Sequence, residues 1–188
     1  MVYDSHYFLA ISIPDQLKLW VKEQQQQLLQ LSKLSYKHHV DFADFHITIK
    51  FLGPASIQKK QRMINQLQQL KNNESFHLSI GSIGHFGSPT QPRVLWLRVA
   101  LNNHLIDLFQ QIESITEKIG FPKENKFYQP HITLVKKWRT GHLDQQDWNR
   151  MNKQINEKQL LTVDTFKLYQ IEPNEKPMYK SIQKFKLL

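Results

Sequence analysis

The sequence predicts an α+β fold with two lobes, mostly antiparallel sheets and a cleft between the lobes. Three observations lead to this prediction. Strand-like and helix-like segments take turns along the 188 residues, and several strands are joined by turns too short for a parallel crossover. The tetrapeptide His-Ile-Thr-apolar also occurs twice, at residues 46–49 and 131–134, each time after one helix and before another. Such a repeat indicates an internal duplication, so we expect residues 1–188 to form one domain of two lobes related by a pseudo-twofold axis.

The first half of the chain reads as strand, helix, strand, helix. Residues 6–13 alternate and end at Pro14, which suits the first position of a helix running to about Leu34. Four consecutive glutamines, residues 24–27, lie inside this helix, and we interpret them as a solvated face without a function. After the strand that begins at His46, Ser56 is a typical N-cap for a second helix.

The second half contains the remaining strands and two more helices. Strands are predicted at residues 76–83, 93–101, 131–138, 160–172 and 178–188. A turn-rich segment, residues 84–92, joins the first two of them. A third helix is expected from Asn103 to Ile119, where Gly120 stops it, and a short fourth one around Trp148.

Composition restricts the classes of function. There are 25 Lys and Arg against 16 Asp and Glu, which gives a net charge of +9. Such a charge favours the binding of polyanions such as nucleic acid, but it can also merely keep the protein soluble. The absence of cysteine excludes disulfides and thiolate chemistry. No apolar run approaches the roughly 18 residues of a membrane span and no cleavable leader is recognisable, so we expect a cytoplasmic protein without a membrane partner.

If each copy of the repeated motif is a strand, the faces on which its side chains lie can be predicted. Side chains alternate between the faces of a strand, so His46 and Thr48 share one face, as do His131 and Thr133. Two lobes facing each other would therefore line their cleft with two imidazoles and two hydroxyls. By the same alternation Lys50 lies on the face of His46 and could meet a phosphate, although a solvated lysine is at least as good an explanation.

Two histidines and two threonines suit acid–base chemistry at a phosphodiester. With an unperturbed pKa near 6.5, one imidazole can be neutral while the other is protonated, which gives a base and an acid. Threonine hydroxyls can donate hydrogen bonds to anionic oxygens. A metal site is a weaker explanation, because threonine is a poor ligand and no carboxylate or cysteine lies at ligand spacing near either motif. Ordinary, hydrogen-bonded strand histidines are the remaining alternative.

The segments HITIKFLG and PHITLVKKW resemble the two His-x-Thr-x motifs of the 2H phosphoesterases, and specifically of the RNA 2′,3′-cyclic phosphodiesterases, also called 2′-5′ RNA ligase-like proteins. The likeness extends to YFLAISIP near the start, to FGSPTQPRVLWLRV in the middle and to MYKSIQKFKLL at the end. It implies hydrolysis of an RNA-type 2′,3′-cyclic phosphate to a 2′-phosphomonoester, without a metal or another cofactor, in a cleft between two lobes.

The resemblance also implies a role for each motif residue. His46 would donate a proton to the departing 3′ oxygen, and His131 would accept a proton from water. Thr48 and Thr133 would bind non-bridging oxygens of the phosphate. The partner would be an RNA or nucleotide with a cyclic phosphate end, and we expect the protein to act as a monomer.

The sequence departs from this family where the second motif usually continues to an arginine, because Lys136 stands there. Lysine keeps the charge but loses the bidentate fork. Simple alternation turns Lys136 away from His131, so it would reach the cleft only through a twist or a bulge of the strand. Tyr128 is a further substrate-binding candidate, since it could stack on a base, although a buried aromatic is the slightly favoured explanation. For Phe8 and Phe51, packing in the core is the expectation.

Two other functions stay open at this stage. The same histidines could join 2′-5′ RNA ends if a 5′ hydroxyl replaced water. Alternatively, the protein could be an RNA-binding module without catalysis, although such a module has no need of two imidazoles at matched positions.

Overall fold

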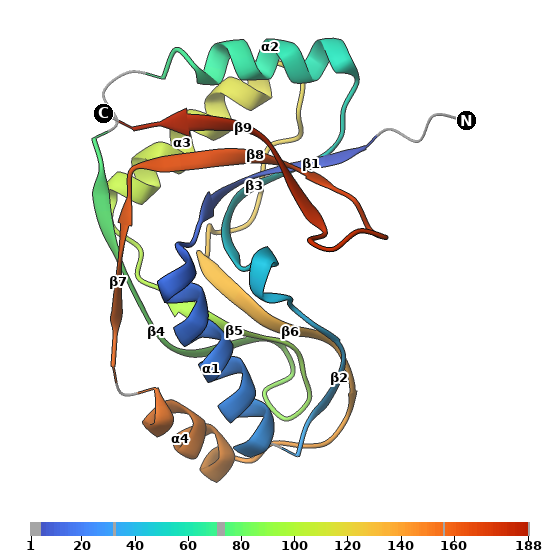
Figure 1. Ribbon diagram of the computed structural model, residues 1–188, viewed down its shortest axis with the longest axis vertical. Coiled ribbons are helices and arrows are strands. Elements are labelled where there is room, and N and C mark those ends of the chain that lie inside the picture. The colour runs from blue at the N-terminus through green and yellow to red at the C-terminus, as the bar shows by residue number, and fades with distance from the viewer. Residues whose placement is uncertain (1–4, 32, 71–73, 156, 188) are drawn as a thin grey trace.

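The computed structural model describes residues 5–31, 33–70, 74–155 and 157–187, and its strands form two antiparallel sheets (Figure 1). The first sheet has the order β3-β1-β8-β9. Its strands are β1 (His6–Ser12), β3 (His46–Pro54), β8 (Thr165–Ile171) and β9 (Tyr179–Lys186). The second sheet has the order β2-β6-β5-β4-β7. Its strands are β2 (Ser35–His39), β4 (Phe76–Gly87), β5 (Pro92–Val99), β6 (His131–Thr140) and β7 (Gln159–Val163).

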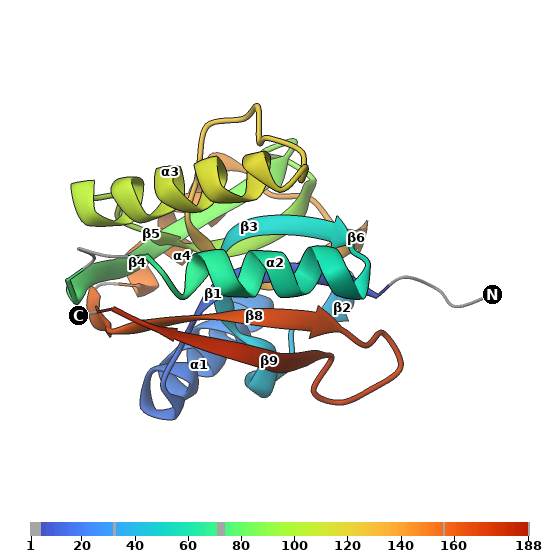
Figure 2. The same ribbon diagram turned by 90° about the horizontal axis from the view of Figure 1, so that it is seen from above.

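Each sheet is packed against a pair of helices, and the two pairs lie toward opposite ends of the molecule in Figure 1. Helix α3 (Asn103–Lys118) packs against β3 and against α2 (Ile57–Leu67), next to the first sheet. Helix α1 (Asp15–Leu31) packs against β6 and against α4 (Gln145–Gln154), next to the second sheet. Figure 2, seen from above, shows α2 and α3 side by side over the strands of the first sheet.

The two lobes follow the same order of elements, which agrees with an internal duplication. In the first lobe β1 lies between β3 and β8, and in the second β5 lies between β6 and β4. The helix that follows each central strand packs on the other lobe: α1 follows β1, and α3 follows β5. Because the lobes exchange these helices, they bury a continuous core, and the predicted bilobal α+β fold is confirmed.

The lobes are nevertheless not the two halves of the chain. Strand β2, which the sequence pattern did not reveal, joins the second sheet, and the C-terminal strands β8 and β9 return to the first. The predicted strand at residues 160–172 is in fact two strands of different sheets, separated at Asp164. The N-cap at Ser56 is confirmed, since its Oγ accepts a hydrogen bond from Lys59 N. That the chain is one monomeric domain stays a prediction.

A buried ion pair ties the first motif strand to the loop that precedes the second motif. Lys50 Nζ lies 2.5 Å from Glu113 Oε1 on α3 and donates to Pro122 O at 2.8 Å. The second carboxylate oxygen of Glu113 accepts from Glu124 N at 3.1 Å. Both charged side chains are over 90% buried, so each requires the other to offset its lost hydration. The pair thus fixes the loop of residues 121–130 relative to β3.

Removing one partner of this pair should destabilise the protein strongly. We expect Lys50→Met to lower the free energy of unfolding by about 3–5 kcal/mol, because it leaves the Glu113 carboxylate buried and unpaired. The double variant Lys50→Met, Glu113→Met should regain part of this loss. Urea denaturation measures both, with Lys123→Met of the exposed Lys123–Glu117 pair as the control, where a change below about 1 kcal/mol is expected. Equal effects of the Lys50 and Lys123 variants would contradict this account.

Candidate active site

The first motif histidine is anchored by the backbone that precedes it. His46 Nδ1 donates to Asp44 O at 2.7 Å, and because a carbonyl can only accept, Nδ1 carries the proton in the neutral ring. Nε2 then accepts from Thr48 Oγ1 at 3.0 Å. Asp44 belongs to the short 3₁₀ turn η1 (Phe42–Asp44), and its carboxylate accepts from Met178 N and Tyr179 N, at the beginning of β9.

The second motif histidine is anchored in the same way. His131 Nδ1 donates to Gln129 O at 2.8 Å, so its Nε2 is also the nitrogen that can exchange a proton. In both motifs the acceptor is the carbonyl two residues before the histidine. The arrangement holds both rings with Nδ1 toward the backbone, which leaves Nε2 for chemistry.

Aromatic side chains surround both imidazoles in a matched pattern. The His46 ring lies 4.9 Å from Phe8 and edge-on to Tyr179 at 5.0 Å, as measured between ring centroids. The His131 ring lies 5.5 Å from Trp96 and edge-on to Phe86 at 5.0 Å. Phe8 and Trp96 come from the central strands β1 and β5. These rings restrict the orientation of each imidazole.

Two adjoining cavities bring the motif residues together at the junction of the lobes, where β3 and β6 lie side by side (Figure 1). The smaller one, of about 170 Å³, is lined by Val40, Asp44, His46, Thr48, Thr133, Lys136 and Tyr179. The larger one, of about 1040 Å³, is lined by His131 and Tyr128 and shares Thr48 and Lys136 with the smaller. All six residues singled out from the sequence therefore line one cavity or the other.

A β-bulge directs Lys136 toward the cleft. Thr133 pairs with Trp96 and Val135 with Leu95, so Leu134 is an extra residue on β6. This extra residue reverses the alternation, and Lys136 opposes Val94 on the face of Thr133 and His131. From the sequence, Lys136 was expected to reach the cleft only through a twist or a bulge of the strand, and the bulge at Leu134 meets this condition.

A second bulge, in β3, overturns the expectations for Lys50 and Phe51. Ala10 pairs with Thr48 and Leu9 with Lys50, so Ile49 is the extra residue. Lys50 consequently points away from His46, toward Glu113, and the prediction that its side chain shares the face of His46 is wrong. Phe51 now lies on the cleft face, 58% exposed, and lines the larger cavity, so its predicted core packing is wrong as well. Phe8 does pack in the core, with 3% exposure.

Tyr128 connects the lobes. Its hydroxyl donates to Thr48 O at 3.1 Å, and its ring stacks on Phe109 with 4.3 Å between centroids and 4° between planes. One face of the ring is therefore already occupied by protein. Burial raises the pKa of the Tyr128 hydroxyl, so it stays protonated and keeps this hydrogen bond.

Burial also controls the charge of the site. It lowers the pKa of His46 to about 4, although the hydrogen bond to Asp44 O opposes the shift, and His131 and Lys136 lower it further. Burial likewise lowers the pKa of His131, against the hydrogen bond to Gln129 O. The pKa of Lys136 is lowered by burial and by Lys137, while Asp44 raises it. Both imidazoles are therefore neutral at pH 7 in the free protein.

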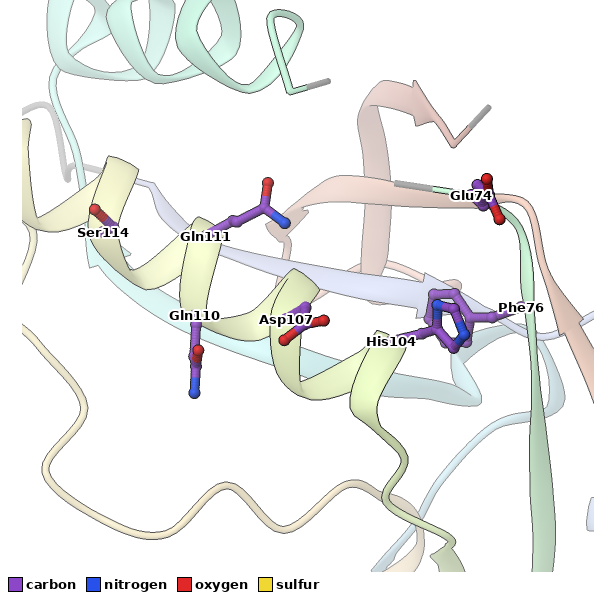
Figure 3. Close-up of a pocket in the computed structure, with 7 residues that line it drawn as sticks. All are labelled: Glu74, Phe76, His104, Asp107, Gln110, Gln111 and Ser114. Carbon is purple, nitrogen blue, oxygen red and sulfur yellow. The ribbon is translucent and has the colours of Figure 1, made fainter. Parts of the chain in front are cut away.

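Two further cavities formed by the described residues are lined by none of the six predicted site residues. One of about 360 Å³ lies between α3 and the start of β4 (Figure 3), where His104 stacks on Phe76 at 5.8 Å. Within residues 5–31, 33–70, 74–155 and 157–187, no group of three or more His, Cys, Asp or Glu could hold a metal ion. None of the helices described in these ranges is long and apolar enough to span a membrane.

Sequence reasoning missed the residues that position the histidines. Asp44 and Gln129 act through backbone carbonyls, which any residue type could supply. Tyr179 reaches His46 from the last strand, more than 130 residues along the chain. In the structure both acceptor carbonyls lie two residues before their histidine, but no residue type in the sequence marks these positions.

Because Gly84 has no side chain, the Trp96 ring fits beside it and next to His131. A substitution at Gly84 should therefore displace the Trp96 ring. A Cβ at Gly84 would lie 2.1 Å from Trp96 Cη2. Gly84→Ala should therefore lower the free energy of unfolding by about 1–3 kcal/mol and shift the NMR signals of the His131 ring. Gly81→Ala on the same strand is the control, because its Cβ meets first the flexible side chain of Lys158, at 3.1 Å. Unchanged His131 signals in Gly84→Ala would contradict this positioning.

The lowered pKa of His46 makes stability depend on pH in a defined direction. A histidine with a pKa near 6.5 when unfolded and about 4 when folded binds more protons in the unfolded state between these values. Its contribution to stability is therefore complete above pH 6.5 and lost as the pH falls through 4. NMR titration should give a His46 midpoint near 4, and His46→Asn should lose less stability over this range. A midpoint near 6.5 in the folded protein would refute the assignment.

Comparison with known proteins identifies the family of this chain. A family model described as the 2′-5′ RNA ligase superfamily matches residues 13–175. The RNA 2′,3′-cyclic phosphodiesterase of Bacillus subtilis (strain 168) is 29% identical over 188 residues, which cover 97% of this chain and 96% of the relative. That of Methanocaldococcus jannaschii is 32% identical over 130 residues, covering 68% of each chain.

Solved structures share the fold. LigT of E. coli complexed with 3′-AMP superposes with a TM-score of 0.74 at 19% identity, covering 97% of this chain and 98% of that one. TT0787 of Thermus thermophilus reaches 0.76 at 19% identity, covering 97% of both chains. The resemblance suggested by the two motifs is confirmed. Because the family model matches most of the length of the chain, the chain belongs to the 2′-5′ RNA ligase superfamily.

Proposed function

We propose that this protein hydrolyses a 2′,3′-cyclic phosphate at the end of an RNA or nucleotide and yields a 2′-phosphomonoester. The observation that carries the proposal is the matched pair of imidazoles, one from each lobe, whose Nε2 atoms are the nitrogens left for proton transfer. The names of the relatives from Bacillus subtilis and Methanocaldococcus jannaschii support the substrate class. The net charge of +9 favours a polyanionic ligand.

The pair suits an in-line displacement at phosphorus. His131 Nε2 accepts a proton from water as the water oxygen bonds to phosphorus. On the opposite side the bond from phosphorus to the 3′ oxygen breaks, and His46 Nε2 gives that oxygen its proton. The product carries the phosphate on the 2′ oxygen, and the next proton exchange with solvent restores the starting state of both rings.

One imidazole must be protonated before this reaction starts. In the free protein burial keeps both neutral at pH 7, but an anionic phosphate beside Nε2 favours the charged ring and raises its pKa. The negative charge of the bound substrate thus favours protonation of His46, which can then act as the acid. Assigning the acid to His46 and the base to His131 follows the family resemblance, since both rings have the same type of anchor.

The remaining cleft residues would bind the phosphate and the nucleotide. The hydroxyls of Thr48 and Thr133 and the ammonium of Lys136 line the small cavity and would donate to non-bridging oxygens. Tyr128 offers little free ring surface, because Phe109 stacks on it, so we assign it to positioning β3 and propose base contacts for Phe51 instead.

The reaction as proposed requires no metal. General acid, general base and an ammonium together meet the demands of proton transfer and charge stabilisation. Besides hydroxyls, an imidazole and an ammonium, the small cavity is lined by one carboxylate, that of Asp44. Both oxygens of this carboxylate already accept from the backbone N–H groups of Met178 and Tyr179, so the set is a poor one for a divalent cation. Activity in the presence of a chelator tests this part of the proposal.

Replacement of either motif histidine should abolish turnover of a nucleoside 2′,3′-cyclic phosphate. We expect His46→Ala and His131→Ala each to lower kcat by about 10²–10⁴-fold, the usual contribution of positioned proton transfer. The assay is run with a chelator, and phosphorus NMR identifies the 2′ or 3′ monoester. His77→Ala, at an exposed position of β4, is the control and should keep full activity.

Other outcomes identify the alternatives. RNA binding with strong salt dependence but no turnover would mean a binding module. Joined product from RNA halves with 2′,3′-cyclic phosphate and 5′-hydroxyl ends would show ligation. Wild-type turnover by folded His46→Ala or His131→Ala would refute the two-histidine mechanism.

A further inference from the structure

Gln25 is a buried glutamine whose amide is completely paired. It lies on α1 with 1% of its surface exposed. Its Nε2 donates to Val40 O at 3.0 Å and to Leu134 O at 2.7 Å, and its Oε1 accepts from Lys22 Nζ at 2.7 Å. Because carbonyl oxygens only accept, no other orientation of the amide satisfies these groups. The expectation that residues 24–27 form a solvated face is wrong for this residue, and also for Gln24, which is 6% exposed.

The carbonyl that Gln25 binds belongs to the bulge of β6. Leu134 is the extra residue of that strand, and its oxygen accepts from Val40 N at 3.0 Å as well as from Gln25. Val40 directly follows β2. Gln25 therefore links α1 both to the end of β2, 15 residues away in the sequence, and to the bulge, 109 residues away.

The backbone is also irregular on the other side of Lys136. Lys137 has a φ of 63°, the left-handed region that residues other than glycine rarely adopt. Such a conformation persists where surrounding contacts impose it. Lys136 thus lies between a bulge and a left-handed residue, so the direction of its side chain depends on the contacts that hold this segment.

We infer that Gln25 is a positioning residue for Lys136, which acts by stabilising the bulge at Leu134. In a regular strand Lys136 would face away from His131, and with the bulge it lines the small cavity with His46, Thr48 and Thr133. The inference rests on the proposed function, because it assumes that Lys136 binds the phosphate of the substrate. Gln25 itself lines none of the cleft cavities described above.

Gln24 supplies a matched control. It has the same side chain, lies on the same helix and is also buried, but its Oε1 has no hydrogen-bond partner. Substitution of Gln24 by methionine removes buried amide atoms without touching the bulge. A general effect of altering α1 should therefore appear in both variants, and an effect through Lys136 only in Gln25→Met.

The experiment compares Gln25→Met, Gln24→Met, Lys136→Met and the double variant Gln25→Met, Lys136→Met. KM and kcat are measured on a nucleoside 2′,3′-cyclic phosphate, and the affinity for inorganic phosphate by calorimetry. We expect Gln25→Met to raise KM and weaken phosphate binding by about tenfold, as loss of a charge-assisted contact does, with a smaller change of kcat. Gln24→Met should match wild type, and the double variant should be no worse than Lys136→Met alone.

Additive losses in the double variant, or equal losses in Gln24→Met and Gln25→Met, would overturn the inference. So would a phosphate affinity that is the same in wild type and Lys136→Met. If Gln25→Met does not fold, Lys22→Met, which removes only the donor to Gln25 Oε1, should raise KM about threefold in the same non-additive way, and an unchanged KM would overturn the inference. A wild-type protein that binds phosphate through Lys136 but turns over no cyclic phosphate would refute the proposed function and leave the role of Gln25 intact.

Discussion

The site depends on one type of hydrogen bond, made twice, between a histidine Nδ1 and the carbonyl two residues before it. His46 and His131 each make this bond at the first residue of a strand. It fixes the tautomer, since the carbonyl can only accept, and it aims Nε2 away from the backbone. Aromatic rings from neighbouring strands then restrict the remaining rotation. Two equivalent anchors at the junction of two lobes produce a matched pair of proton-exchanging atoms.

The same packing that orients the imidazoles also keeps them uncharged. Burial lowers the pKa of both, and the cations of the cleft add to this for His46. An anion in the small cavity would meet hydroxyls, an ammonium and the ring of His46, whose pKa the anion raises. The free protein therefore avoids the cost of two partly buried positive imidazoles, and in the proposed reaction a bound phosphate would favour the protonated form of His46.

Two β-bulges determine which basic side chain serves the cleft. The bulge at Ile49 turns Lys50 into the core, where Glu113 neutralises it, and the bulge at Leu134 turns Lys136 to the cleft. Without them the alternation would place Lys50 at the cleft and Lys136 behind it. The first bulge also exposes Phe51, which adds an aromatic surface to the larger cavity.

The sequence alone determined the fold class and the strand faces on which the four motif residues lie. Paired motifs in matched surroundings encode a duplication, and strand alternation next to His46 and His131 is too short-ranged to be upset by a later bulge, so Thr48 and Thr133 were assigned correctly to the face of their histidines. The tertiary structure decided the rest. A bulge depends on contacts with other strands and with α1, as Gln25 illustrates, and the exchange of helices and C-terminal strands between lobes depends on which faces must be buried. These contacts join residues far apart in the chain, and local patterns of hydrophobicity carry no record of them.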